Sequence, residues 1–283
     1  TLLAAALPGL RRAGEGFEAS RAARRGSPPE RSGEAWLRLA LRDLGEWAHD
    51  NTPPTRGYLD PTLRPEYGVL SAWGHGHLLR YTAERPMVQD NFGPWGGREG
   101  SEAARRYYAS EDEGEAAALA GRLGARYVVA TIRGSGQGAP APGSLGHRLV
   151  PVRRPDGVLT GRGAPLERHR LVYVADDGGR RPKQGHGLLA PALYEIVAGA
   201  RVRGMAPEGV AHVRFDLTLE LPVGERFHHR AVAEVAGDGS YEVRLPIPSE
   251  AGYQVSAGGQ VASLRITERD VREGLLVVGP HFE

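Results

Sequence analysis

The segment from Ala211 to Leu221 alternates strictly between apolar and polar side chains. Its apolar members are Ala211, Val213, Phe215, Leu217, Leu219 and Leu221. A period of two residues places these side chains on one face of an extended chain, so the segment predicts a half-buried β-strand. Turn signals follow at 222–224 and 237–239. Further short strands are expected to begin near Phe227, Tyr241, Tyr253 and Val261, and a last one is expected from Leu275 to Val278. Short strands separated by turns are typical of a small antiparallel β-sandwich, which we place at residues 200–283.

Helical and extended patterns follow one another before residue 200. Residues 34–48 carry apolar side chains at helical spacing, and Pro53-Pro54 blocks continuation of that helix. Further helices are expected to end near residue 81 and to cover 101–108 and 110–123, with strands at 67–71, 126–132 and 170–174. This order is typical of a layered α/β unit. We therefore expect a mixed α/β central domain at 34–199, an α+β fold, and an irregular or mobile leader at 1–33.

Three helix ends can be predicted from single residues. Ser101 can cap the first of the later helices, and Ser110 and Glu113 have the spacing of a capping box for the second. Gly124 is expected to stop that helix in a left-handed conformation. The acidic run 111–115 is then a solvated helix start that complements the helix dipole. A divalent-cation site is the disfavoured alternative, because the run lacks the alternation of ligands and the loop glycine that calcium loops use.

Composition excludes several function classes. The 283 residues include 36 basic and 34 acidic side chains, and this near-balance argues against a nucleic-acid partner. The absence of cysteine excludes disulfides, thiolate nucleophiles and zinc sites with cysteine ligands. No apolar run is long enough to span a bilayer. Because the chain begins at Thr1 rather than methionine, we expect it to be a fragment of a longer protein.

The densest group of candidate binding residues follows the strand expected at 67–71. It comprises Ala72, Trp73, Gly74, His75, Gly76 and His77. Loops at strand ends collect ligands in α/β folds, and an indole could supply an apolar wall and an N–H donor. The alternative is a glycine-rich turn with Trp73 packed into the core, and the residue types alone favour that alternative. A metal is not expected, because no third ligand is fixed by spacing beside His75 and His77.

Residue chemistry alone reveals no self-contained active site, but the chain resembles a known family. Residues 46–132 resemble the C-terminal region of the catalytic subunit of oligosaccharyltransferase, the enzyme of protein N-glycosylation. The similar stretches are 46–53, 67–77, Arg85-Pro86, 90–92 and 123–129. Residues 194–283 resemble the β-rich peripheral domain of archaeal-type members, with similar stretches at 194–200, 239–241 and 268–271.

The resemblance implies a division of labour. In the family a Trp-Trp-Asp face binds the hydroxyl of the Ser or Thr two residues after the acceptor Asn. The divalent cation, Mn or Mg, and the catalytic carboxylates lie on loops between transmembrane helices, outside this chain. The fragment would therefore bind an acceptor polypeptide, while the membrane half would bind the lipid-linked oligosaccharide. The fragment itself would be monomeric, inactive, without a cofactor, and exposed to the periplasm or the cell exterior.

The chain departs from the family at its recognition motif. The family has Trp-Trp-Asp-Tyr-Gly where this chain has residues 72–76, so Ala72, Gly74 and His75 replace the first Trp, the Asp and the Tyr. The family's second peptide-contacting motif, an Asp and a Lys on a helix, should fall at 131–140, where neither residue is found. Two functions stay open. One is a divergent glycan-transferring enzyme, and the other is a non-catalytic carbohydrate- or peptide-binding module.

Overall fold

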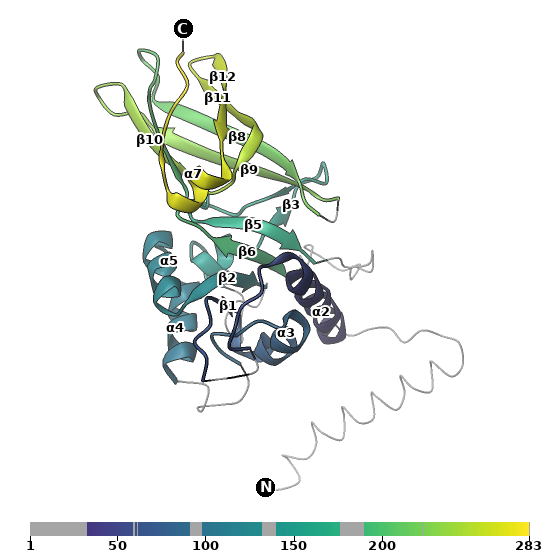
Figure 1. Cartoon of the computed structure of the whole chain (residues 1–283). Coiled ribbons are helices and arrows are strands. Elements are labelled where there is room, and N and C mark those ends of the chain that lie inside the picture. Colours follow the sequence, from purple (N-terminus) through teal and green to yellow (C-terminus); the bar gives the residue numbers. More distant parts are fainter. Residues whose placement is uncertain are drawn as a thin grey trace, which may run out of the picture. The chain divides into compact units, whose positions relative to one another are not determined.

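The computed structural model describes residues 33–58, 60, 62–90, 98–131, 140–175, 190–222 and 224–282. Contacts between residues divide the chain into Thr1–Leu37 and Arg38–Glu283, and the second unit carries all the strands described (Figure 1). The leader expected at 1–33 therefore lies almost wholly outside the described residues. Among the helices of the described segments, none has the length and apolar character needed to cross a bilayer.

Helices precede most of the strands, and the fold class is α+β as expected. The helical segments are α2 (Gly33–Asn51), η1 (Trp73–His75), α3 (Gly76–Ala83), α4 (Arg98–Ala109), α5 (Glu113–Arg122), α6 (Leu145–Arg148) and α7 (Glu268–Glu273). The strands are β1 (Gly68–Leu70), β2 (Ala125–Ala130), β3 (Val152–Arg153), β4 (Leu159–Thr160), β5 (His169–Val174), β6 (Ala192–Ile196), β7 (Ala200–Met205), β8 (His212–Glu220), β9 (Arg226–Glu234), β10 (Ser240–Leu245), β11 (Ser249–Ala257), β12 (Gln260–Ile266) and β13 (Leu276–Val278).

A mixed four-stranded sheet forms the first half of the Arg38–Glu283 unit. Its order is β1-β2-β6-β5, with β1 parallel to β2 and β6 antiparallel to both of its neighbours. In Figure 1, α2 and α3 lie on one side of this sheet, and α4 and α5 lie on the other. Parallel pairing brings the C-terminal ends of β1 and β2 to the same edge of the sheet. The chain leaves β1 at that edge and enters the candidate segment, residues 72–77.

The start of α5 differs from the expectation. Asp112 is the N-cap, and its carboxylate accepts a hydrogen bond from the backbone N–H of Glu115. Ser110 instead donates its hydroxyl to the carbonyl of Asp112. The predicted capping box of Ser110 and Glu113 is wrong, because Glu113 is buried and its carboxylate binds other groups. The acidic run is therefore not uniformly solvated.

Of the two other helix ends predicted from the sequence, one is wrong and one is confirmed. Ser101 does not cap a helix, because it lies inside α4, which begins at Arg98. Gly124 does follow α5 with a φ of 71°, the left-handed conformation expected at a helix end.

A β-sandwich forms the second half of the unit. A six-stranded sheet has the order β12-β11-β8-β9-β4-β3, and a three-stranded sheet has the order β10-β7-β13. The alternation predicted for 211–221 is confirmed in part: Val213, Phe215 and Leu217 of β8 are buried and Leu219 is half-buried, whereas Ala211 is exposed and precedes the strand. The ring of Phe215 contacts Tyr241 of β10, with centroids 5.9 Å apart, and so joins the two sheets.

Two pairs within the sandwich depart from the antiparallel pattern. β4 is parallel to β9, and β13 is parallel to β7. β3 and β4 belong to the six-stranded sheet although they come from residues 152–160, ahead of the sandwich strands in sequence. Sequence pattern could not reveal this, because two-residue strands carry no periodicity.

Candidate functional site

The candidate segment forms a tight helical turn directly after β1. Ala72 is buried and has an extended backbone, and its carbonyl accepts a hydrogen bond from the N–H of His75 at 2.9 Å. Trp73 opens the turn and is 44% exposed, so the expectation of an indole packed into the core is wrong. His75 ends η1 and His77 lies in the first turn of α3, both half-buried.

The two glycines of the segment have different surroundings. A Cβ atom at Gly76 would lie 2.4 Å from the carbonyl oxygen of Gln89 and 2.5 Å from the Cα of Asp90, so only glycine fits against that strand-like segment. A Cβ at Gly74 would meet no atom within 4 Å. Gly74 therefore leaves an open space beside Trp73. Gly76, in contrast, allows the start of α3 to lie in close contact with the backbone of Gln89 and Asp90.

Buried polar side chains fix the chain segments on both sides of the turn, at the end of β1 and in α3. The Gln89 side chain is buried and donates its amide N–H to the carbonyl of Ser71 at 2.6 Å, just where β1 ends. Arg80 of α3 donates to the Asp90 carboxylate at 3.2 Å and to the carbonyl of Tyr58 at 2.9 Å. Because Asp90 is also buried, the ion pair anchors α3 to the segment packed against Gly76.

Arg85 joins the ends of α2 and α3. Its side chain is buried and donates to the hydroxyls of Thr52 and Tyr67 and to the carbonyls of His49, Thr52, Ala83 and Glu84. No carboxylate of the described residues lies within ion-pair distance of it. Carbonyl oxygens at helix C-termini carry partial negative charge, and here they stabilise the guanidinium in place of a carboxylate.

An exposed aromatic stripe runs from the turn along α3. His77 and Tyr81 are one helical turn apart on the same face of α3, and Trp73 lies in the preceding turn, η1. Tyr81 is 79% exposed. Within the described segments, no three His, Asp or Glu side chains come together as a metal site would require. The arrangement offers the exposed rings of Trp73 and Tyr81 to a ligand as aromatic surface.

A second polar cluster, buried and missed by the sequence analysis, centres on Glu113. Its carboxylate lies 2.7 Å from His169 Nδ1 and 3.0 Å from Arg148 Nη2, and the other imidazole nitrogen of His169 lies 2.6 Å from the hydroxyl of Tyr107. Burial by itself would raise the pKa of Glu113. The hydrogen bond and charge of His169, with the N–H groups of residues 167 and 168, lower that pKa on balance. No local pattern could reveal this cluster, because its members are far apart in sequence.

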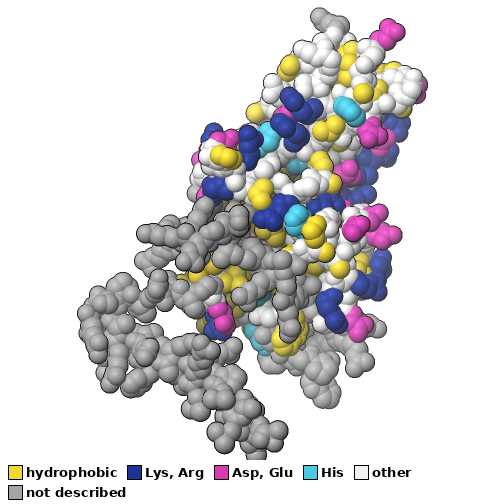
Figure 2. Space-filling view, turned by 180° about the vertical axis from the view of Figure 1, so that it is seen from behind, with side chains coloured by type: hydrophobic (Ala, Val, Ile, Leu, Met, Phe, Trp, Pro, Cys, Tyr) yellow, Lys and Arg dark blue, Asp and Glu magenta, His cyan; other side chains and the backbone are white. Residues whose placement is uncertain are grey.

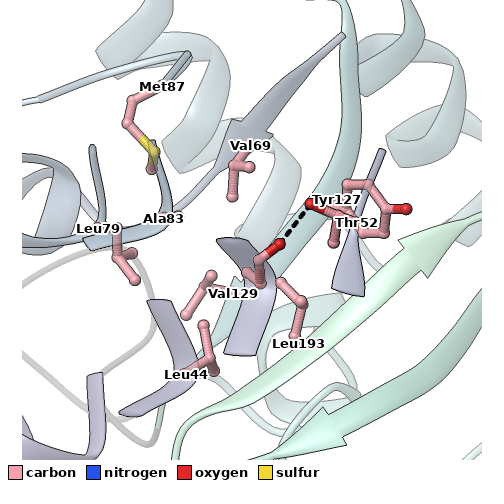
Figure 3. Close-up of a pocket in the computed structure, with 10 residues that line it drawn as sticks. Leu44, Thr52, Val69, Leu79, Ala83, Met87, Tyr127, Val129 and Leu193 are labelled. Carbon is pink, nitrogen blue, oxygen red and sulfur yellow. Dashed lines mark hydrogen bonds between the residues drawn. The ribbon is translucent and has the colours of Figure 1, made fainter. Parts of the chain in front are cut away.

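A small apolar cavity lies between α2, α3 and the first sheet (Figure 3). Its lining includes Leu44, Val69, Leu79, Tyr127 and Leu193, and its volume is about 10 Å³. Ligand pockets are typically about 300–1,000 Å³, so this space can hold at most one water-sized molecule. The cavity is therefore a packing defect of the core and not a binding site.

Basic and acidic side chains are interspersed on the face of the molecule shown in Figure 2. Several arginines of the sandwich are matched by carboxylates, as in the pairs Arg201–Glu242 and Arg230–Asp216. This distribution is unlike the continuous basic stripe of a nucleic-acid-binding surface.

Two family models match successive parts of the chain. The AglB core domain matches residues 41–134, and the archaeal glycosylation protein B long peripheral domain matches residues 199–277. Among curated proteins, the dolichyl-phosphooligosaccharide-protein glycotransferases 1 and 2 of Archaeoglobus fulgidus are each 30% identical, over 94 and 93 residues. Each match covers 33% of this chain, but only 13% and 15% of the two relatives.

Solved structures share the fold. The A. fulgidus oligosaccharyltransferase in complex with zinc and sulfate has a TM-score of 0.61 at 18% identity, covering 89% of this chain and 46% of that one. The A. fulgidus enzyme AglB in complex with an inhibitory peptide and a dolichol-phosphate also scores 0.61, at 17% identity over 89% and 43%. The chain thus spans less than half of these structures. With an AglB core domain followed by an AglB long peripheral domain, the chain is a divergent C-terminal domain of the archaeal oligosaccharyltransferase family.

Proposed function

We propose that this chain is the acceptor-recognition domain of a membrane oligosaccharyltransferase, which transfers a lipid-linked glycan to asparagine in proteins. The observation that carries the proposal is Trp73, an exposed indole on a turn that is anchored from behind. A fixed, exposed indole gives an extended peptide an apolar wall and an N–H donor without a large loss of side-chain entropy. The residues proposed to line the peptide site are Ala72, Trp73, Gly74, His75, Gly76 and His77.

The partners are proposed from the relatives. One solved A. fulgidus structure is tethered with an acceptor peptide containing the NVT sequon, and another holds an inhibitory peptide and a dolichol-phosphate. We propose that this chain meets an acceptor polypeptide as a monomer, on the periplasmic or outer side of the membrane. The lipid-linked glycan and a divalent cation, Mn or Mg, would be bound by other parts of the full-length protein.

The loss of a carboxylate beside Trp73 predicts weak sequence discrimination. The family's aspartate is replaced by Gly74, around which the structure leaves open space. A hydrogen bond to a charged acceptor is worth about 1.5–3 kcal/mol, and that contribution is missing here. The full-length protein should therefore bind Asn-x-Thr and Asn-x-Ala peptides with affinities within about tenfold of each other.

Calorimetric titration of both peptides into the full-length protein tests this function. Trp73→Ala should weaken both peptides, because the aromatic wall is removed. The matched control is Met205→Ala, which trims an exposed apolar side chain on the three-stranded sheet and should change neither affinity. Loss of binding in the control alone, or full binding by Trp73→Ala, would exclude the turn as the peptide site. A preference for the Thr peptide far above tenfold would mean that His75 or His77 replaces the lost carboxylate.

The non-catalytic binding module is the second candidate, and one observation favours it. The aromatic stripe of Trp73 and Tyr81 stays exposed although the aspartate is gone, which suits a surface that binds peptide or sugar without reading a hydroxyl. Sequence upstream of Thr1 in the full-length protein separates the two candidates. Many hydrophobic spans with carboxylates in their outer loops would support the enzyme.

A further inference from the structure

Two arginines outside the candidate site converge on one backbone carbonyl. Arg244 of β10 donates from Nη1 to the carbonyl oxygens of Ala198 and Gly199, at 2.7 and 3.1 Å. Arg168, just before β5, donates from Nη1 to the same carbonyl of Ala198 at 3.4 Å. The two guanidinium groups are therefore neighbours, although like charges repel each other.

Neither of these arginines forms an ion pair with a carboxylate of the described residues. Both side chains are half-buried, and toward the described residues each donates side-chain hydrogen bonds from Nη1 alone. A guanidinium carries five N–H donors in a planar fork, so most donors of the pair are left for another acceptor. Burial lowers the pKa of Arg244, and the neighbouring charge of Arg168 lowers it further. A bound negative charge would stabilise the charged guanidinium of Arg244 and so counteract both of these effects on its pKa.

The backbone around the pair is rigidly supported. The N–H of Arg168 donates to the buried Glu113 carboxylate at 2.7 Å, and its carbonyl accepts from Val197 N–H at 2.9 Å. Gly199 has a φ of 74°, and a Cβ there would lie 2.7 Å from Cγ of Arg244, so the arginine stem crosses directly over this glycine. The buried cluster around Glu113 and the glycine therefore fix where the two guanidinium groups lie.

Other charges around the pair leave it with a positive excess. Arg201 lies next to Arg244 across the β7–β10 pairing. Glu242 is engaged by Arg201 and Arg203, and the carboxylate of Asp112 caps α5. Glu167 also lies near the pair, and its charge interacts favourably with Arg244 and Arg168, but among the described residues it forms no ion pair with either.

We propose that Arg168 and Arg244 form a binding site for an oxyanion with at least two acceptor oxygens, such as a sulfate, a phosphate or a carboxylate. Two neighbouring guanidinium groups can together donate several charge-assisted hydrogen bonds to the oxygens of such a group. The site lies beside the loop that leads from β6 into β7, and it is independent of the peptide site proposed at Trp73.

Nuclear magnetic resonance titration of the whole 283-residue chain tests the proposal, with the backbone N–H signals of Ala198, Gly199 and Arg201 as reporters. Sulfate represents a free inorganic oxyanion, glucuronate represents a carboxylate on a sugar, and glucose is the neutral control. Chloride at equal ionic strength corrects for screening. We expect saturable shifts with sulfate or glucuronate and none with glucose. Tighter binding of sulfate would indicate a free inorganic oxyanion as the ligand, and tighter binding of glucuronate would indicate a carboxylate on a sugar.

Variants decide whether the pair is responsible. Arg168→Gln and Arg244→Gln should each weaken the apparent affinity by roughly tenfold or more, since each removes charge-assisted hydrogen bonds. Arg265→Gln removes an exposed charge from β12 and should leave the affinity unchanged. Glu167→Gln should strengthen binding, and it provides the test if a glutamine variant at either arginine fails to fold. Absence of saturable shifts with both anions, or equal affinity in all variants, would overturn the site.

Discussion

Single residues in this protein owe their importance to partners distant in sequence. Arg85 satisfies carbonyls at the ends of two helices, and Gly76 admits the segment at Gln89 and Asp90. Glu113 appears in the sequence as part of an exposed acidic run, but the structure buries it against His169. These residues position the elements around the Trp73 turn and the Arg168 loop.

Arg85→Met is expected to destabilise the fold by about 3 kcal/mol or more. Methionine retains much of the side-chain volume, but it leaves the buried carbonyl and hydroxyl acceptors without a donor. Urea denaturation measures the change. Arg64→Met is the control at an exposed position, where a shift within about 0.5 kcal/mol is expected. Equal stability of the two variants would show that water satisfies the acceptors around Arg85.

Because His229 is buried, we expect the folded protein to lose stability in mild acid. Burial lowers its pKa to about 4, because the charged imidazole would lie in the sandwich core beside Tyr253. The unfolded chain protonates this histidine near its ordinary pKa of about 6.5, whereas the folded chain does not. The stabilising contribution is thus complete above about pH 6.5 and declines as the pH falls toward 4, by about 2 kcal/mol at pH 5.

His229→Leu should remove that part of the pH dependence. Unfolding free energies at pH 7 and pH 5 would differ less in the variant than in the unaltered chain, by about 2 kcal/mol. His212→Leu, at an exposed position of β8, should leave the pH profile unchanged. An identical profile for His229→Leu would mean that the imidazole is hydrated in the folded state.

Elements of the sandwich were predicted best, because its longer strands bury alternate side chains. The strands expected near Phe227, Tyr241, Tyr253 and Val261 are confirmed as β9 to β12, and the last strand is confirmed as β13. β3, β4, β7 and α7 were missed. The first two are too short for a pattern, and α7 depends on a capping box of Thr267 and Asp270 that the sequence analysis did not use.

Phe215→Ala should destabilise the sandwich by about 3–5 kcal/mol. The ring is fully buried on β8 and contacts Tyr241 of the facing sheet, so truncation leaves a cavity between the sheets. Thermal or urea unfolding measures the loss. Val232→Ala on β9 is the control, because that side chain is 47% exposed and its removal should cost little. An unchanged midpoint for Phe215→Ala would show that the two sheets close around the gap.

At the scale of the whole molecule, the family and the α+β class follow from both sequence and structure, whereas the boundary proposed near residue 200 stays a prediction. The ion pairs of Glu268 with Arg170 and of Arg272 with Glu195 link α7 to the first sheet. The matches cover only 13% and 15% of the two curated relatives.

The purified 283-residue chain should transfer no glycan to an Asn-x-Thr peptide, even with a lipid-linked oligosaccharide and Mn or Mg present. The proposed catalytic carboxylates and metal ligands belong to other parts of the full-length protein. Mass spectrometry of the peptide detects any product, and the full-length protein is the positive control. A glycosylated peptide formed by the fragment alone would contradict the proposed division of labour.

The sequence by itself determined β8 to β13 except for their exact ends, the first long helix, the left-handed end at Gly124 and the resemblance to the family. These features depend on local periodicity and on residues adjacent in the chain. Only the tertiary structure decided that Trp73 is exposed, that Gly76 is sterically required, and that Glu113 is buried. It also brought Arg168 beside Arg244. The reason is physical: burial, close approach and charge pairing depend on contacts between segments tens of residues apart, and a local pattern does not encode those contacts.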